Sequence, residues 1–268
     1  MQSVCLAKSQ GISNFILIGN EANTKKILQN INQNLNFDII NETKEEEACK
    51  IAVSLAKDGK ATAIMKGICE TSTIMRSVLN KDYGIIKSKN LSHLAAFEVK
   101  ENVYHKLIFL TDAAINISPN ISDKKEIIRN SVSFLHKLGI PSPKVALLAA
   151  KEKVDKKMPI TLEYEQIVKE HLLNNYKDCE IYGPLALDNA INKNAANIKG
   201  ITNSVAGDAD ILLCPNIEAG NILYKSLAFL AEAKTCGIVL GAQVPLVLTS
   251  RADTAQTKLL SITMSTIM

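Results

Sequence analysis

The chain has 268 residues, a formal net charge of +4 and a hydrophobic content of 47%. Because the net charge is mild and Lys and Arg are spread along the chain, nothing points to nucleic acid or a membrane surface as a partner, whereas a small anionic substrate is compatible. No apolar run approaches the roughly 20 residues that cross a bilayer, and the first residues, MQSVCLAKSQG, lack the apolar core of a signal peptide. We therefore expect a cytoplasmic, enzyme-sized protein.

The cysteines and histidines form no ligand pattern. The six cysteines have no short paired spacing, which predicts free, reduced thiols: Cys5, Cys49, Cys69, Cys179, Cys214 and Cys236. The four histidines lie outside any metal-ligand or nucleophile motif: His93, His105, His136 and His171. We expect no metal site, and the histidine positions argue against a Ser-His-Asp hydrolase.

In the first part of the chain, short apolar runs alternate with segments of helical periodicity. We predict helices over residues 1–10, 21–33, 43–57 and 71–79, and strands over residues 15–19, 37–41 and 61–66. The third helix has a capping pattern in Thr43, Glu46 and Glu47. Two further strands, 91–99 and 106–112, follow each other without a helix, which predicts an antiparallel pair.

The second part continues the alternation after a loop that contains Pro and Asn. We predict helices over residues 123–137, 162–174, 188–198 and 217–233, and strands over residues 144–150, 180–183, 211–214, 237–242 and 246–249. This order predicts the α/β class, with a boundary between two lobes near residue 120, hence segments 1–120 and 121–268.

The last predicted strand leads into Ser250 and Arg251, where we expect a helix to begin. Helix amino-termini gather at the carboxyl ends of parallel strands, and the guanidinium of Arg matches phosphate oxygens. Ser250 and Arg251 therefore predict a phosphate or oxyanion cradle. Ser250 and Asp253 also spell an ordinary capping box, S-x-x-D, which requires no ligand. Both interpretations stay open.

A similar ambiguity affects the segment NIEAGNILYK. Asn216 is a good helix cap, whereas Gly220 and Asn221 are poor helix formers in the first turns. Their presence indicates close approach by a ligand or another backbone, and tight helix packing is an equal alternative.

A second candidate cluster is KGICETSTIMR, which runs from Lys66 to Arg76 and includes Thr71. A strand, a glycine, a helix start rich in hydroxyls and then a cation can hold a phosphate-bearing ligand. The cluster lacks the glycine pattern of a P-loop or a dinucleotide fingerprint. The alternative is an exposed helical Arg76 without a ligand.

Two further polar groups follow predicted strands. Thr111, Asp112 and Asn116 lie in TDAAIN, and Asp188 and Asn189 lie in LALDNAI. In both cases the side chains could contact a ligand or only shape the loop. Taken alone, these features indicate an α/β enzyme that acts on an anionic ligand.

Five separated blocks cover much of the chain: MKGICETSTIMRSVL, FLTDAAINISP, YGPLALDNAI, SVAGDADILLCPNIEAGNILYKSL and GIVLGAQVPLVLTSRAD. In this order they resemble the phosphate acetyltransferase and phosphate butyryltransferase family, with TDAAINI, LALDNAI and TSRAD closer to the butyryl branch. The resemblance implies reversible transfer of an acyl group between coenzyme A and inorganic phosphate. It also implies a homodimer, no bound cofactor, and a two-lobed, three-layer α/β/α fold similar to that of isocitrate and isopropylmalate dehydrogenases.

The resemblance also assigns residues. The family's Ser-Arg pair at the phosphate site matches Ser250 and Arg251, and its coenzyme A-contacting Arg matches Arg76. The remaining substrate-binding candidates lie in the same blocks: Lys66, Thr71, Thr111, Asp112, Asn116, Asp188, Ser204, Asn216, Gly220 and Asn221.

The chain departs from the family at two places. Acetyl-type members carry an Asp seven residues after the Ser as the proposed thiol base, whereas this chain has Thr257, which leaves Asp253 as the nearest carboxylate. Family members usually begin with an additional apolar strand, whereas this chain starts inside the helix that follows it. Three alternatives stay open: a misplaced start, a fragment cut from a longer protein, or a sheet that lacks an edge strand. Two rival functions stay open, a dehydrogenase on a similar fold and a non-catalytic acyl-CoA-binding relic.

Overall fold

The computed structural model describes residues 1–31, 35–173, 178–250 and 253–268. Contacts within the chain define two compact units, unit 1 with Met1–Lys87 and Cys236–Met268, and unit 2 with Ser88–Thr235. The α/β class predicted from the sequence is confirmed, because strands and helices alternate in both units. The lobe boundary predicted near residue 120 stays a prediction.

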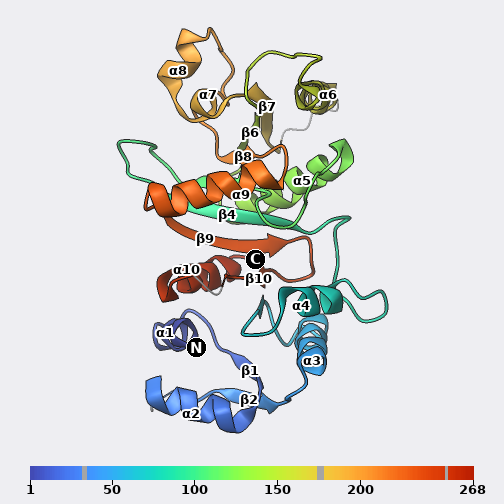
Figure 1. Ribbon diagram of the computed structural model, residues 1–268, viewed down its shortest axis with the longest axis vertical. Coiled ribbons are helices and arrows are strands. Elements are labelled where there is room, and N and C mark those ends of the chain that lie inside the picture. Colours follow the sequence, from blue (N-terminus) through green and yellow to red (C-terminus); the bar gives the residue numbers. More distant parts are fainter. Residues whose placement is uncertain (32–34, 174–177, 251–252) are drawn as a thin grey trace. The chain divides into compact units, whose positions relative to one another are not determined.

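Unit 1 contains five helices and five strands among the described residues, most of which are labelled in Figure 1. The helices are α1 (Gln2–Ser9), α2 (Glu21–Ile31), α3 (Glu45–Lys57), α4 (Thr71–Val78) and α10 (Ala255–Ser265). The strands are β1 (Ile16–Gly19), β2 (Asp38–Asn41), β3 (Ile64–Met65), β10 (Leu246–Val247) and β9 (Lys234–Leu240), the last belonging to unit 1 from Cys236 onward. Strand β1 pairs in parallel with β2, and β10 pairs in parallel with β3 and antiparallel with β9.

The two ends of the chain share a core in unit 1. Val4 and Ala7 of α1 pack against Leu259 and Ile262 of α10. Gly11 ends the first helix region with φ +69, a left-handed conformation that glycine adopts without strain. The helix predicted over residues 1–10 is thus confirmed as α1.

Unit 2 has five strands in the order β4-β5-β8-β6-β7. They are β4 (Ser92–Glu98), β5 (Ile108–Thr111), β6 (Lys144–Leu148), β7 (Glu180–Leu185) and β8 (Ile211–Leu213). The predicted antiparallel pair is confirmed as β4 and β5, and the remaining neighbours are parallel. Its helices are α5 (Ile121–Lys137), α6 (Pro159–Leu173), α7 (Leu187–Ile191), α8 (Lys193–Ile198) and α9 (Ile217–Lys225), followed by a π-helical turn, η1 (Ser226–Leu230).

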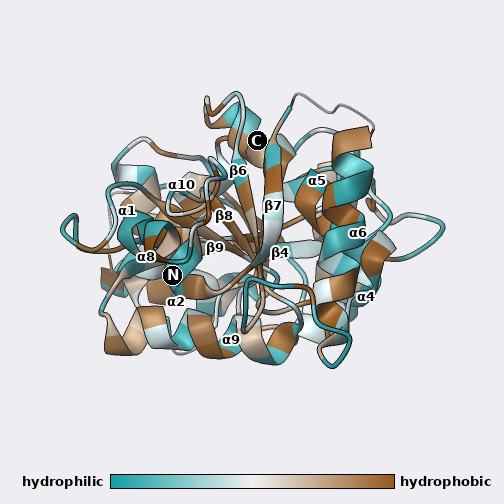
Figure 2. Cartoon of the chain, turned by 90° about the horizontal axis from the view of Figure 1, so that it is seen from above, coloured by the Kyte–Doolittle hydropathy of each residue, from teal (hydrophilic) through white to brown (hydrophobic). Residues whose placement is uncertain are grey.

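The central strands of unit 2 are apolar on both faces. Val145, Ala146 and Leu147 of β6 and Ile211 of β8 are fully buried, and Figure 2 shows the hydrophobic colour along β8, with both colours alternating along α5 and α6. Continuous apolar runs are typical of parallel strands that helices cover on both sides. No helix in the described ranges is long and apolar enough to cross a membrane.

Several predicted boundaries are wrong, each for a local reason. The helix predicted over residues 188–198 is split at Asn192, whose extended backbone and side-chain bond to the Ala195 N–H start a second helix. The helix predicted to end at residue 233 ends at Lys225 and continues as η1. Helix α3 begins after Lys44 without a side-chain cap, so the predicted capping by Thr43 is absent.

Candidate functional site

Two parallel strands of unit 1 end together and bring two candidate segments to one edge. Residues Leu246 and Val247 of β10 lie opposite Ile64 and Met65 of β3, and the Lys66 N–H donates to the Val247 carbonyl at 3.0 Å. Both strands run in the same direction, so the loop that begins at Lys66 and the one that contains Ser250 leave the same edge. This is the edge where ligands gather in parallel α/β sheets.

The loop after β3 is held at both ends by hydrogen bonds. Lys66 is 8% exposed, and its Nζ donates to the Cys69 carbonyl at 3.0 Å. The Glu70 N–H donates to the carboxylate of Glu45 on α3 at 2.9 Å. Helix α4 then begins at Thr71, as predicted, with the Thr71 side chain exposed at its first turn. A fixed loop, a lysine and a helix amino-terminus form an arrangement that can hold an anion.

Arg76 lies one to two turns further along α4, and its side chain reaches α3. Its side chain is 72% exposed and its Nη1 lies 3.5 Å from the carboxylate of Glu46 on α3. An exposed pair at this distance contributes little to stability. The guanidinium can therefore exchange Glu46 for another anion at small cost.

The segment after β10 forms a turn before its helix. The Ser250 N–H donates to the Asp253 carboxylate at 2.7 Å, and the Asp253 N–H donates to the Ser250 carbonyl at 3.2 Å. Arg251 lies outside the described residues. Helix α10 begins only at Ala255, after Thr254, whose hydroxyl accepts from the Thr257 N–H at 3.1 Å. The predicted helix start at Ser250 and Arg251 is thus wrong, because Thr254 provides the cap.

In unit 2, the parallel strands β5 and β8 end side by side, with Thr111 opposite Leu213. The Thr111 hydroxyl is buried and donates to the His93 carbonyl at 2.8 Å. The Asp112 carboxylate accepts four hydrogen bonds, from the N–H groups of His93, Ala114 and Ile115 and from the Asn116 side chain. A carboxylate has about four acceptor positions. These contacts support the loop-shaping interpretation of Asp112.

Helix α9 packs directly on the same loop. Asn216 caps the helix by accepting the Ala219 N–H at 3.0 Å, as predicted. A Cβ on Gly220 would lie 2.2 Å from the Asp112 carbonyl oxygen, and the Asn221 side chain donates to the Ala113 carbonyl at 3.2 Å. The close approach predicted for Gly220 is therefore that of another backbone. The structure brings Thr111, Asp112, Asn116, Asn216, Gly220 and Asn221 together.

A cavity of about 680 Å³ opens beside Asn216. Its lining includes Lys124, Glu163 and Cys214, which the sequence reasoning missed. Lys124, whose side chain is 3% exposed, pairs with Glu163 at 2.8 Å, and burial together with the charge of Asp112 raises the pKa of Cys214 to about 12. Asn120 and Asp123 form the capping box that starts α5. Nothing in the sequence pattern showed that Lys124, in the first turn, would be buried.

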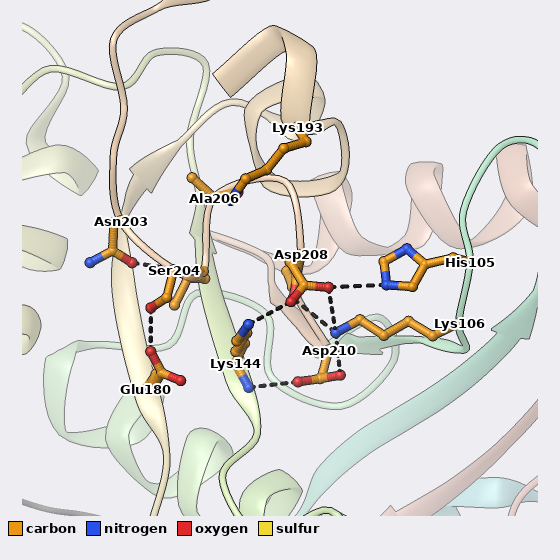
Figure 3. Close-up of polar contacts among 12 residues, drawn as sticks. His105, Lys106, Lys144, Glu180, Lys193, Asn203, Ser204, Ala206, Asp208 and Asp210 are labelled. Carbon is orange, nitrogen blue, oxygen red and sulfur yellow. Dashed lines mark hydrogen bonds and ion pairs between the residues drawn. The ribbon is translucent and has the colours of Figure 1, made fainter. Parts of the chain in front are cut away.

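The last two candidates lie near opposite ends of β7, Asp188 after its last residue and Ser204 beside its first. Asp188 is exposed on α7, next to Asn189, which is fully buried and has no side-chain hydrogen-bond partner among the described residues. Ser204 donates to Glu180, the first residue of β7, and so lies at the amino-terminal ends of the strands (Figure 3). Asp188 directly follows Leu187, which lines the cavity beside Asn216.

Figure 3 shows an ion cluster near Ser204. Lys106 contacts Asp208 and Asp210 at 3.0 and 2.7 Å, and Lys144 contacts Asp208. Burial opposes the ionisation of Asp208, but hydrogen bonds from the two lysines and their charges hold its pKa at about 2. A cavity of about 610 Å³ adjoins the cluster.

The described residues contain no group of His, Cys, Asp and Glu that could hold a metal ion, and the six cysteines are free.

Comparison with known proteins gives a consistent result. A family model described as Phosphate acetyl/butaryl transferase matches residues 37–266. The chain is 43% identical over 266 residues to a phosphate butyryltransferase from Clostridium acetobutylicum. The aligned residues cover 99% of this chain and 88% of the relative. The crystal structure of a branched-chain phosphotransacylase from Enterococcus faecalis matches with a TM-score of 0.87 and 32% identity over 99% of this chain and 93% of that one. A putative 4-hydroxythreonine-4-phosphate dehydrogenase from Salmonella typhimurium shares the fold, with a TM-score of 0.59 at 13% identity over 94% of this chain and 89% of that one.

Proposed function

Because the chain belongs to the phosphate acetyl/butaryl transferase family, we propose that it transfers a short-chain acyl group reversibly between coenzyme A and inorganic phosphate. It is a phosphate acyltransferase, and butyryl-CoA with phosphate would yield butyryl phosphate and free coenzyme A. The identity to a phosphate butyryltransferase supports the butyryl group over the acetyl group.

One observation carries the assignment of the phosphate site. The register of β3 and β10 brings the Lys66 loop and the Ser250 turn to one strand edge, which supports a phosphate site built from Lys66, Ser250 and Arg251. Attack of a phosphate oxygen on the thioester carbonyl breaks the carbon–sulfur bond and develops negative charge on the carbonyl oxygen and the departing sulfur. Fixed cations and N–H groups stabilise such charge.

In the reverse direction, the coenzyme A thiol must lose its proton, because the thiolate is the nucleophile. We assign this proton transfer to Asp253. Its carboxylate accepts the Ser250 N–H at 2.7 Å, and a carboxylate retains further acceptor positions after one hydrogen bond. Coenzyme A contact is assigned to Thr71 and Arg76, since the exposed Arg76–Glu46 pair is readily exchanged for a phosphate group.

The remaining candidates are proposed as substrate contacts on the family resemblance alone: Thr111, Asp112, Asn116, Asp188, Ser204, Asn216, Gly220 and Asn221. The enzyme is further proposed to be a cytoplasmic homodimer that uses coenzyme A as a substrate and needs no bound cofactor. Large apolar side chains at Ile222, Phe229 and Leu230, exposed along α9 and η1, support an interface there.

The decisive experiment measures release of free coenzyme A from butyryl-CoA and from acetyl-CoA, with and without phosphate. We expect release that depends on phosphate and is faster with butyryl-CoA. A dehydrogenase would instead reduce or oxidise a nicotinamide cofactor, and an acyl-CoA-binding relic would bind without turnover. Folded protein that releases no coenzyme A from either substrate would contradict the proposal.

A further inference from the structure

An apolar side chain stands in the middle of the otherwise polar loop between β3 and α4. Ile68 is 88% exposed, the highest exposure of any large hydrophobic side chain in the part of the chain that the structure describes. The adjacent Gly67 has no described atom within 4 Å of the position that a Cβ would take. The loop therefore borders open space at Gly67, and Ile68 projects outward rather than into a core.

The loop cannot easily fold Ile68 inward. Lys66 is fixed by its N–H bond to Val247 at 3.0 Å and by its Nζ bond to the Cys69 carbonyl at 3.0 Å. On the other side, Glu70 is fixed by its N–H bond to Glu45 at 2.9 Å. Ile68 thus lies between two anchored points, and its exposure follows from the path of the backbone.

The position of the loop relates Ile68 to the reaction. It lies three residues beyond β3, at the strand edge that also leads to Ser250. The loop's other groups, the Lys66 ammonium and the Thr71 hydroxyl, suit phosphate oxygens. The substrate has one part that is purely hydrocarbon, the acyl chain, and exposed apolar surface gains free energy only from an apolar partner.

We infer that Ile68 contacts the acyl chain of the substrate and sets the preference for butyryl over acetyl groups. This inference rests on the proposed function and adds a specificity residue to it. Butyryl exceeds acetyl by two methylene groups, and burial of each against an apolar surface favours binding about fourfold. Because Ile68 would contact only part of the acyl chain, we expect it to raise the ratio of kcat/KM for butyryl-CoA to that for acetyl-CoA by roughly five- to tenfold.

The test compares kcat/KM for butyryl-CoA and acetyl-CoA, both with phosphate, in the wild type, Ile68→Val, Ile68→Ala and the control Ile198→Ala. Ile198 on α8 is matched in residue type and exposure, at 84%. We expect the butyryl-to-acetyl ratio to fall about five- to tenfold in Ile68→Ala, through butyryl-CoA alone, with an intermediate ratio in Ile68→Val. The control should keep the wild-type ratio.

Three results would overturn the inference. An equal loss for both substrates would assign Ile68 to the coenzyme A portion that they share. An unchanged ratio would leave it without a role in specificity, and a change in oligomeric mass by light scattering would assign it to a protein contact. Equilibrium binding of both acyl-CoAs is measured by calorimetry in parallel. A wild-type protein without transfer activity would contradict the proposed function. The inference would still be tested by calorimetry, because Ile68→Ala should then bind butyryl-CoA with less preference over acetyl-CoA than the wild type does.

Discussion

At the residue scale, Gly220 is the glycine whose ideal Cβ position lies nearest to another atom in the described structure. The Asp112 carbonyl oxygen occupies the space that a side chain would take at this position, 2.2 Å from an ideal Cβ. The sequence predicted a close approach here because glycine is a poor helix former near the start of α9. It could not show which backbone approaches, since Asp112 is more than a hundred residues away along the chain.

Gly220→Ala is expected to destabilise the protein by about 1 to 3 kcal/mol, because either α9 or the Asp112 loop must shift to admit the methyl group. Thermal unfolding should detect this as a decrease in Tm of several degrees. Gly67→Ala is the matched control, since no described atom lies within 4 Å of its Cβ position. Equal Tm values for the two variants would contradict the packing argument.

The carboxylate of Asp253 also has one structural contact and one proposed chemical role. Asp253→Asn keeps an oxygen that can accept the Ser250 N–H but cannot take a proton at neutral pH. We expect formation of acyl-CoA from acyl phosphate and coenzyme A to slow about a hundredfold or more, since general base catalysis contributes roughly 10²- to 10⁴-fold, while Tm changes little. Comparison of initial rates in this direction with thermal unfolding separates the two roles, and unchanged turnover with a lowered Tm would make Asp253 a structural residue only.

At the element scale, one ion cluster joins three strands of unit 2 at their amino-terminal ends. Lys106 precedes β5, Lys144 begins β6, and Asp208 and Asp210 precede β8. The Lys144 N–H also donates to Asp210 at 2.8 Å. The cluster therefore fixes the relative positions of strands that are distant in the sequence.

Asp208→Asn should lower the free energy of unfolding by roughly 1 to 2 kcal/mol at pH 7, because the side chain is 30% exposed and water weakens the ion pairs. The folded pKa of about 2 is below the usual value near 3.9. The stabilisation is thus present above pH 4 and is lost as the pH falls toward 2. Urea unfolding of both proteins at a series of pH values measures this, with Asp188→Asn as an exposed control. A difference that stays constant down to pH 2 would contradict it.

The sequence predicted the type and order of nearly every element, because apolar periodicity decides which face is buried. The ends of the helices depend instead on local hydrogen bonds, which apolar periodicity does not show. Thr254 accepts the Thr257 N–H and so moves the start of α10 past Ser250. The Ala231 N–H bonds the Ser226 carbonyl five residues back, which converts the end of the predicted α9 into a π-turn. Such choices depend on single hydrogen bonds.

The candidate site was predictable only where residues adjoin a strand end. Lys66 and Ser250 follow β3 and β10, so their proximity is a consequence of parallel pairing. Lys124 and Glu163 belong to different helices, and no periodicity shows that these two side chains meet beside the cavity. Ser204 was grouped with the site through the resemblance, yet its partner Glu180 lies at the amino end of β7.

At the scale of the whole molecule, the apolar side chains on α9 and η1 are the main support for a dimer. Phe229 and Leu230 are 67% and 84% exposed, and burial of such groups between two copies would be favourable. Phe229→Ser is expected to shift the protein toward monomer, as measured by sedimentation at several concentrations. Ile198→Ser, at a position 84% exposed on α8, should leave the mass at twice that of one chain. A wild-type protein of single-chain mass at all concentrations would contradict the dimer.

The division of the chain into units also sets an order of events during synthesis. Unit 2 is one continuous segment, Ser88–Thr235, whereas unit 1 needs both Met1–Lys87 and Cys236–Met268. Domains generally fold as units while the chain emerges from the ribosome. Unit 2 can therefore fold before β10 and α10 have been synthesised, when β3 and α1 still lack these packing partners. A pause in translation after residue 235 would leave the apolar faces of Val4 and Ala7 without their partners Leu259 and Ile262, so the enzyme depends on its last 33 residues to protect its first 87.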